Sequence, residues 1–357
     1  MSATIAPPGP PAPSPDAMES LSGRRLPRWA PWAVLVVAAA LALLLAAFTA
    51  VSGRAGTSLV GIGLFIALQS GWSFAVEGRR HAIDRFATTL IYSSFVIAMI
   101  PLVAILVSVV VNGIKAFTPY FLLHSMRNVD PRGTGGGEYH AIIGTIEVVG
   151  MAAIIGIPIG ILVAIYLVEY GNRSRLARLI SFFVDVMTGV PSIVAGLFVY
   201  TFLVLTLGFQ QSGLAGALSL SILVIPIVVR SSEEMLKLVP TELRESSYAL
   251  GVPKYRTIMR IVVPTALPGM ITGAMLAISR VTGETAPLLL TMFLTQSINT
   301  NPLTGPQATL PTFIWDQILN GTDASTNRAW AAALTLILFV MILNIVARLL
   351  ARLSRVK

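Results

Sequence analysis

Two opposite charges lie within an apolar stretch of this sequence. The segment AISRVTGETAPLLL, residues 277–290, places Arg280 and Glu284 near the middle of a predicted membrane span. An unpaired charge at bilayer depth costs on the order of 3 kcal/mol, so both side chains are expected to face protein or water. At positions i and i+4 of a helix they would share one face.

Two interpretations of this pair are open. In the first, Arg280 and Glu284 form an intrahelical ion pair that neutralises both charges and only assists packing. In the second, Arg280 lines a transport route and offers its planar set of donors to an oxyanion, while Glu284 holds the guanidinium in place. Glu284 would then also moderate the affinity, because a transport site must release what it binds.

The composition indicates a membrane protein. Of 357 residues, 55% are hydrophobic and 11% are charged, whereas soluble domains carry about 25% charged residues. Several apolar runs of about 20 residues are long enough to cross a bilayer. With no cysteine and three scattered histidines, neither a disulfide nor a metal site is predicted. In such a chain the net charge of +9 concerns membrane orientation and does not indicate nucleic acid.

We predict an all-α polytopic protein of about eight transmembrane helices, in three parts. Residues 1–31 are rich in proline, alanine and serine and are expected to be a disordered cytoplasmic tail. Residues 32–86 form a transmembrane hairpin with a cytoplasmic link, and residues 87–357 form the main domain. The predicted spans are 32–51, 58–76, 87–111, 142–168, 180–207, 213–229, 266–292 and 329–351.

The distribution of basic residues sets the predicted orientation. With eight spans, nineteen of the 25 lysines and arginines lie on the side of the N-terminus and five on the other side. Basic residues are enriched in cytoplasmic loops, so both termini are expected to be cytoplasmic. The span 58–76 contains Gln69, Ser70 and several glycines. If this span does not cross the membrane, the predicted orientation inverts.

The largest cytoplasmic loop, residues 230–265, is expected to contain two short helices. Pro240 can open a helix over residues 241–250, Gly251 can cap it, and Pro253 prevents its continuation. A second helix is predicted from Lys254 to about Val262, ending before Pro264. This helix pair would either rest on the spans of its own chain or dock another protein.

Prolines and further charges within the spans suggest where helices bend and pair. We expect bends at residues 188–196 and 283–289, where a proline ring removes an amide donor. Asp185 is expected to pair with Arg178 or another loop base, and Glu147 to reach water. Arg230, at the inner end of its span, is either a membrane anchor or part of a transport route.

The cytoplasmic loop resembles that of the integral membrane subunits of bacterial ABC importers. Their motif reads Glu-Ala-Ala, three residues, Gly, nine residues, Ile, one residue, Leu-Pro. The corresponding residues here are Glu245, Ser246, Ser247, Gly251, Ile261, Val263 and Pro264. Both alanines are serine and the leucine is valine, so these side chains remain small or apolar.

Longer segments resemble the PstA family of phosphate importer permeases, over about residues 87–352. The similar segments are IPIGILVAIYLVEYGN, VPSIVAGLFVYTF, PIVVRSSEEMLKLVPTELRESSYALGVPKY, TGAMLAISRVTGETAPLL and WAAALTLILFVMILNIVARLL. The resemblance implies that residues 87–357 are a six-helix type I ABC importer permease domain, to which the N-terminal hairpin is added. It also implies a bacterial cytoplasmic membrane protein, with Arg280, Glu284 and Arg230 as substrate-pathway residues.

The resemblance further implies an assembly. A PstC-like second permease would complete the pathway as a heterodimer, a PstB-like ATPase dimer would dock on loop 231–264, and a PstS-like protein would deliver phosphate outside. The chain contains no GxxxxGK[ST] motif, in agreement with ATP and magnesium being bound by the partner ATPase. The chain itself is therefore expected to be a permease subunit without a cofactor, and not an enzyme.

Alternatives remain at this stage. An ion-coupled secondary anion transporter could use Glu147, Asp185 and Glu284 as proton or cation relays, although it would have no obvious use for the cytoplasmic helix pair. A membrane scaffold without a substrate would not require buried charges. A guanidinium suits any tetrahedral oxyanion, so a permease for sulfate or molybdate is a further alternative to phosphate.

Overall fold

The computed structural model describes residues 26–48, 54–171 and 174–354, and these residues form helices and connecting loops with no strands. The predicted tail falls mostly on residues 1–25, outside the described residues. Within the described ranges, seven helices are long and apolar enough to cross a membrane, or up to eight if one bent pair counts as a span. The all-α polytopic fold predicted from the sequence is therefore confirmed.

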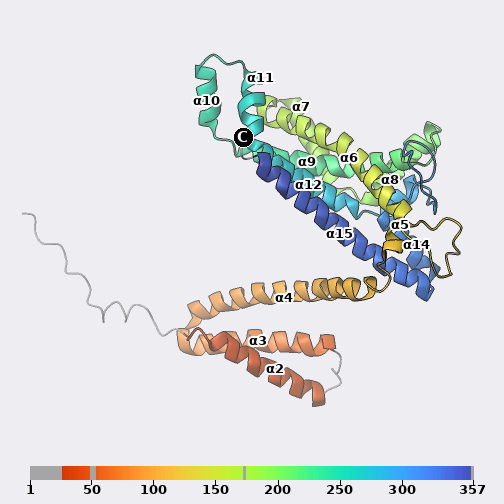
Figure 1. The fold of residues 1–357 in the computed structure, drawn as a ribbon. Helices are drawn as coiled ribbons and strands as arrows, with labels where there is room; N and C mark the ends of the chain where they lie inside the picture. The colour runs from red at the N-terminus through yellow and green to blue at the C-terminus, as the bar shows by residue number, and fades with distance from the viewer. Residues whose placement is uncertain (1–25, 49–53, 172–173, 355–357) are drawn as a thin grey trace, which may run out of the picture. The chain divides into compact units, whose positions relative to one another are not determined.

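The membrane-length helices follow the predicted spans in order, with short helices between them (Figure 1). The α-helices are α2 (Ala30–Phe48), α3 (Arg54–Glu77), α4 (Arg79–Gly113), α5 (Pro119–Leu123), α6 (Tyr139–Ile165), α7 (Arg175–Gly189), α8 (Ser192–Val199), α9 (Gly213–Lys237), α10 (Thr241–Ala249), α11 (Lys254–Thr257), α12 (Val263–Thr282), α13 (Ala286–Thr291), α14 (Leu310–Asn320) and α15 (Asp323–Ser354). Three π-helical segments extend helices, at Tyr166–Tyr170 after α6, Tyr200–Thr206 after α8 and Ile258–Val262 between α11 and α12.

The chain divides into two compact units, Met1–Ile105 and Leu106–Lys357, and the division falls within α4. In the first unit α2 packs against α3 through a stripe of small residues, Ala30, Val34, Ala38 and Ala42. The carboxylate of Glu77 closes the open end of this hairpin. It accepts hydrogen bonds from the backbone N–H of Leu26 at 2.6 Å and from Nε of Arg85 at 2.5 Å.

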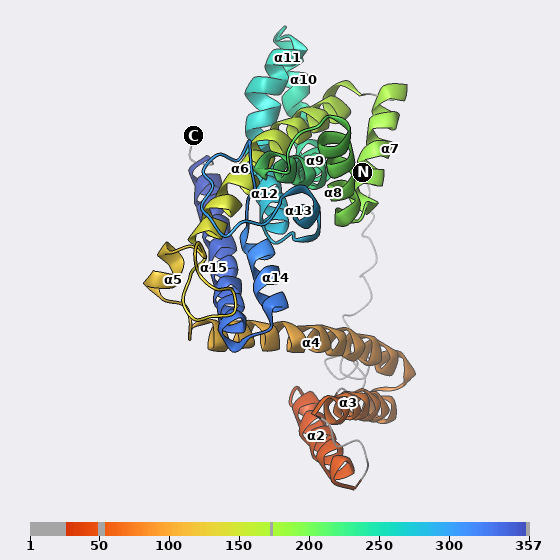
Figure 2. The same cartoon turned by 90° about the vertical axis from the view of Figure 1, so that its right-hand side faces the viewer.

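The core of the second unit depends on glycines that let helices approach closely. α6 packs on α9, and α9 packs on α12, as both views show (Figures 1 and 2). A Cβ atom on Gly156 or Gly160 of α6 would lie 2.8 Å from Val224 or Val228 of α9. Membrane helices lack a hydrophobic driving force against each other, so small residues that permit close backbone contact provide the packing energy.

Both predicted bends are present. The predicted span 180–207 is not straight, because the chain bends by 108° between α7 and α8, beside Pro191. The predicted span 266–292 is interrupted after Thr282, and α13 starts again at Ala286 with Pro287 in its first turn. Proline disfavours helical geometry in the residue before it, which explains the extended backbone of Val190 before Pro191. By contrast, Pro158 and Pro226 lie inside continuous helices.

We predict that Gly160→Val destabilises the second unit by about 1–3 kcal/mol, because the new side chain would overpack against Val228. The matched control is Gly150→Val on the same helix, where a Cβ would meet no atom within 4 Å. The unfolding temperature of each purified variant is measured by heating samples and quantifying the remaining folded protein by size-exclusion chromatography. Equal unfolding temperatures for the two variants would contradict the packing argument.

Candidate functional site

Arg280 lies at mid-depth of the membrane domain. α12 runs antiparallel to α9, with Gly269 against Met235 and Gly273 against Ser231. Continued by two turns, this register places Arg280 level with Val224, the twelfth of the 25 residues of α9. α12 therefore ends level with the middle of α9, two residues beyond Arg280.

The ion pair expected between Arg280 and Glu284 is absent. Arg280 occupies the last turn of α12, whereas Glu284 lies beyond the C-cap residue Gly283, so the two do not share a helix face. The Glu284 backbone N–H donates to the carbonyl of Val281 at 3.1 Å. Within the described parts of the chain, the Arg280 side chain has no hydrogen-bonding or ion-pair partner, and it is exposed. None of its donors is thus engaged by another described residue.

The helix break after Arg280 is held firmly. A Cβ atom on Gly196 of α8 would lie 2.5 Å from Cα of Pro287 in α13, so the two helices are in close contact. The carbonyl of Thr291 accepts a hydrogen bond from the N–H of Ser212 at 3.2 Å. Irregular backbone at membrane depth is tolerated only where protein buries it or where it lines a water-filled cavity. The break at 283–285 is therefore a stable part of the fold that neighbouring helices hold in place.

Arg230 lies in a different environment from Arg280. Its guanidinium pairs with Asp185 of α7 at 2.5 Å and with Glu233 at 2.6 Å. It also donates to Oγ and to the carbonyl oxygen of Ser181. Asp185 thus pairs with Arg230 and not with Arg178 as one alternative had it. These bonds attach α7 to the inner part of α9, and an anion would have to displace a carboxylate to reach this guanidinium.

The elbow, defined here as α10, α11 and the turn between them, agrees with the sequence prediction in its first half. α10 spans Thr241–Ala249, Gly251 has a φ of 71° and Pro253 precedes α11. The second predicted helix does not end before Pro264. It continues without a break from Lys254 to Thr282. The π-helical segment Ile258–Val262 leads directly into Pro264, which lies inside this continuous helix, and the π-helical turn accommodates its missing N–H.

A clamp joins the elbow to α6, and the sequence analysis did not identify it. The carboxylate of Glu169, in the π-helical turn after α6, is 5% exposed and accepts from Nη2 and Nε of Arg244 at 2.8 and 3.1 Å. Arg244 also donates to the carbonyls of Val239 and Leu236. Lys254 donates to the carbonyl of Glu169 and lies over the ring of Tyr170. The sequence signal for this clamp was Glu169 itself, an acid at the end of an apolar span and near a loop rich in basic residues.

The motif residues divide into exposed and buried positions. Glu245, Ser246, Gly251 and Pro264 are exposed and Ile261 is partly buried. Ser247 is buried, and its hydroxyl hydrogen-bonds that of Thr257 at 2.8 Å. Serine in place of the motif's second alanine therefore adds a polar link between α10 and α11.

Polar contacts also order the outer end of the second unit. Arg328 of α15 is buried and donates to the carbonyls of Pro131, Gly133 and Gly135, which fixes the long loop before α6. Glu147 accepts from the side chain of Gln307 at 2.5 Å instead of facing only water.

Glu138 precedes α6 and is fully buried, with Thr335 donating to its carboxylate. Burial raises the pKa of this carboxyl to about 8, against the lowering effect of the Thr335 hydrogen bond. The group is therefore largely protonated at neutral pH and brings no full negative charge to this end of the domain.

Comparison with known proteins gives consistent matches. The family model of the binding-protein-dependent transport system inner membrane component matches residues 156–356. The Phosphate transport system permease protein PstA 1 of Mycobacterium tuberculosis (strain CDC 1551 / Oshkosh) is 49% identical over 273 residues, covering 76% of this chain and 90% of that protein. The Phosphate transport system permease protein PstA of Yersinia pestis is 41% identical over 271 residues, covering 76% and 90%.

A solved structure shares the fold. The bacterial alginate ABC transporter in complex with an alginate pentasaccharide-bound periplasmic protein aligns with a TM-score of 0.56 at 14% identity. The alignment covers 75% of this chain and 94% of that chain. At this level of identity the likeness concerns the arrangement of helices only.

We predict that Glu169→Gln loosens the elbow. The amide keeps the shape of the side chain but removes the charge that strengthens its bonds to Arg244. Hydrogen–deuterium exchange over residues 241–257 should become about tenfold faster, corresponding to ~1.4 kcal/mol of local stability. The control is Glu242→Gln, an exposed acid of α10. Equal exchange in both variants would contradict the role of the clamp.

Proposed function

We propose a specific role for this chain, which belongs to the PstA family of phosphate transport system permease proteins, within the binding-protein-dependent inner membrane components. It is the permease subunit of an ATP-driven importer that moves inorganic phosphate across the bacterial plasma membrane by alternating access. Its relatives are named phosphate transport system permeases, and this choice of phosphate over sulfate or molybdate comes from them.

The observation that carries the proposal is the exposed Arg280 beside a helix break at mid-depth. A guanidinium facing lipid there would cost on the order of 3 kcal/mol or more. Protein or water must therefore cover this face in the assembled transporter. A second, PstC-like permease supplies that cover, and the pathway then runs between the two subunits. Helix breaks near the midplane occur where transporters form their substrate sites.

The chemistry of Arg280 suits a phosphate ion in transit. Its five N–H donors have no partner among the described residues of the chain, and a planar guanidinium can bind two oxygens of a tetrahedral anion at once. Glu284 follows within four residues but does not hold the guanidinium. Its carboxylate instead stands beside the route, where repulsion of the anion limits the affinity and favours release.

Energy reaches this site through one continuous helix. The elbow helix that starts at Lys254 is the same helix that ends just beyond Arg280, about 39 Å away along its axis. An ATPase that pushes on α10 therefore displaces the arginine directly. The elbow presents exposed apolar side chains for such a partner, namely Tyr248, Leu250 and Tyr255. Docking of a PstB-like ATPase dimer here requires the N-terminus of this chain to be cytoplasmic.

We predict that Arg280→Gln lowers phosphate uptake by roughly 10- to 100-fold, the loss expected when one charged hydrogen-bond partner is removed. Arg280→Lys keeps the charge without the planar set of donors, so its phosphate uptake should lie between that of Arg280→Gln and that of the wild type. Uptake of radiolabelled phosphate is measured in vesicles that contain the complete complex, with ATP inside.

The control for this experiment is Arg260→Gln, at the exposed inner end of the same long helix. Complexes lacking this subunit give the background. Normal uptake by Arg280→Gln would contradict a direct role of the arginine. Uptake that follows an ion gradient without ATP would instead support a secondary transporter.

We predict that Gly251→Val weakens binding of the ATPase. Gly251 has a φ of 71°, which costs a β-branched residue about 1–2 kcal/mol, so valine would redirect the turn between α10 and α11. Co-purification of the ATPase with the tagged permease measures the effect. Gly78→Val is the matched control, since Gly78 has a φ of 85° and equally open surroundings outside the elbow. Unchanged co-purification with Gly251→Val would refute elbow docking.

A further inference from the structure

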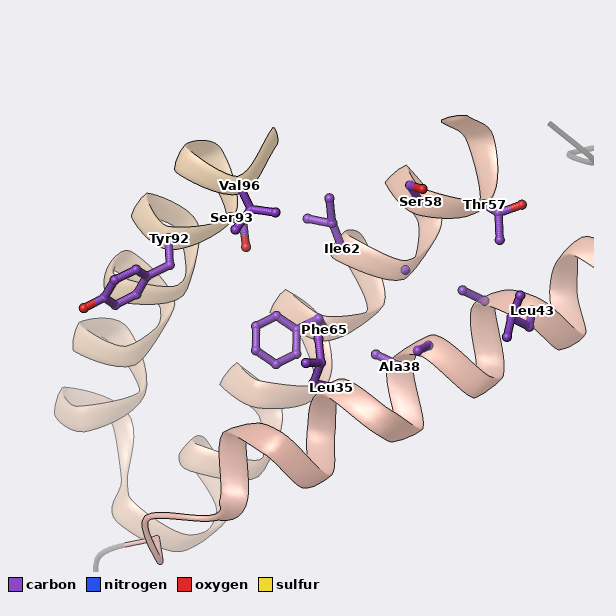
Figure 3. A pocket seen from close by; sticks show the side chains of 13 residues that line it. Leu35, Ala38, Leu43, Thr57, Ser58, Ile62, Phe65, Tyr92, Ser93 and Val96 are labelled. Carbon is purple, nitrogen blue, oxygen red and sulfur yellow. The ribbon is translucent and has the colours of Figure 1, made fainter. Parts of the chain in front are cut away.

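The first unit contains a groove that the transport role does not explain. The family model matches only from residue 156, and the relatives align over 76% of the chain. Within the first unit, the groove lies between the hairpin of α2 and α3 and the beginning of α4 (Figure 3). It consists of two cavities of about 970 and 410 Å³, which share Leu35, Phe65 and Tyr92 and are therefore continuous.

The inner cavity is apolar. Figure 3 shows Ile62 and Phe65 of α3 and Ser93 and Val96 of α4 around one space, with Leu35 and Ala38 of α2 along its side. Small side chains keep the α2 wall flat, which suits a flexible hydrocarbon chain.

The outer cavity forms a polar mouth. Its walls include charged and polar side chains from α3 and α4, namely Gln69, Glu77, His81, Asp84, Arg85, Thr88 and Thr89. Gln69 is 2% exposed and its side-chain oxygen has no partner. The oxygen and the nitrogen of a buried amide normally both have hydrogen-bond partners. An amide carries an acceptor oxygen and N–H donors, so Gln69 can serve either a donor or an acceptor on a ligand in this cavity.

The groove has the depth of one leaflet. Trp32 lines the mouth, and Trp29 packs edge-on against Trp72 with ring centroids 6.3 Å apart. Tryptophans mark the headgroup level of a bilayer. From Trp32 to Leu43, at the far end of the inner cavity, α2 rises about 16 Å. This is close to half of the roughly 30 Å hydrocarbon core.

The charge at the mouth favours an anionic ligand. The described residues next to the mouth include four arginines, Arg28, Arg79, Arg80 and Arg85, against the acids Glu77 and Asp84. Glu77 is already paired with Arg85, so the balance around the mouth is positive. Basic pockets between transmembrane helices on the cytoplasmic side bind anionic lipid headgroups.

From these observations we infer that the first unit holds one anionic glycerophospholipid. One acyl chain occupies the apolar cavity, and Gln69 hydrogen-bonds an oxygen near the glycerol. The phosphate lies at the mouth, where Arg28, Arg79 and Arg80 flank the lining residues in sequence. The lipid comes from the leaflet at the Gly78 end of the hairpin, which the basic residues assign to the cytoplasmic side. It fills the space between α3 and α4, which the Glu77–Arg85 pair bridges at that end.

The test compares two neighbouring alanines of α2. Ala39 lines the groove, whereas Ala40 is equally exposed but does not line it. The complete complex with wild-type chain, Ala39→Phe or Ala40→Phe is purified in detergent and titrated with phosphatidylglycerol or phosphatidylcholine. Native mass spectrometry counts the bound lipids. We expect one retained phosphatidylglycerol in the wild type and in Ala40→Phe. Ala39→Phe should bind phosphatidylglycerol about tenfold more weakly, and the wild type should bind phosphatidylcholine about tenfold more weakly than phosphatidylglycerol.

A second variant guards against misfolding. Gln69→Met has nearly the same shape and removes the unsatisfied amide, so it should weaken phosphatidylglycerol binding without lowering the unfolding temperature of the complex. Equal lipid retention by Ala39→Phe and Ala40→Phe would overturn the site. Equal binding of the two lipids, or a co-purified polypeptide in place of lipid, would overturn the identity of the ligand.

Discussion

The central constraint on this molecule is that a helix ending in the middle of a bilayer must have its last backbone groups and its charges covered. α12 ends at Thr282, level with the middle of α9, and Arg280 lies in its final turn. Every adjacent contact serves this arrangement. Glycines on α12 and α6 bring both helices against α9, and α13 closes the break by packing on Gly196. The chain thus presents a free guanidinium on a rigid frame.

That frame extends to the elbow through charged contacts and not through apolar packing alone. The Glu169–Arg244 pair binds α10 to the end of α6, and the Arg230–Asp185 pair binds α7 to α9. Glu169 is nearly buried, and a buried carboxylate without its partner would be strongly unfavourable. The elbow therefore cannot leave α6 without breaking a costly pair. Force applied to the elbow reaches the membrane helices with little loss to local bending.

The sequence predicted the number and order of the helices well, because apolar runs and basic loops are strong signals in a membrane protein. The bends at Pro191 and near Pro287 also follow from residue chemistry. Two inferences were wrong for a common reason. Pro264 was expected to end a helix and Glu284 to continue one, yet a π-helical turn accommodates the proline and Gly283 ends the other helix. The pairing of Glu169 with Arg244 spans 75 residues and needs three-dimensional proximity that periodicity cannot supply.

The same contacts indicate where the second unit can move. α6, α9 and the long helix 254–282 are joined by glycine packing and by the Glu169 clamp, so they should shift as one block. Residues absorb large backbone changes most easily where regular hydrogen bonding is already interrupted. Two such positions flank the block, at Val190–Pro191 and at Gly283–Thr285. Because the second begins three residues beyond Arg280, rotation there would turn the arginine relative to α13, and under the proposed function this would couple access of the anion to the position of the elbow.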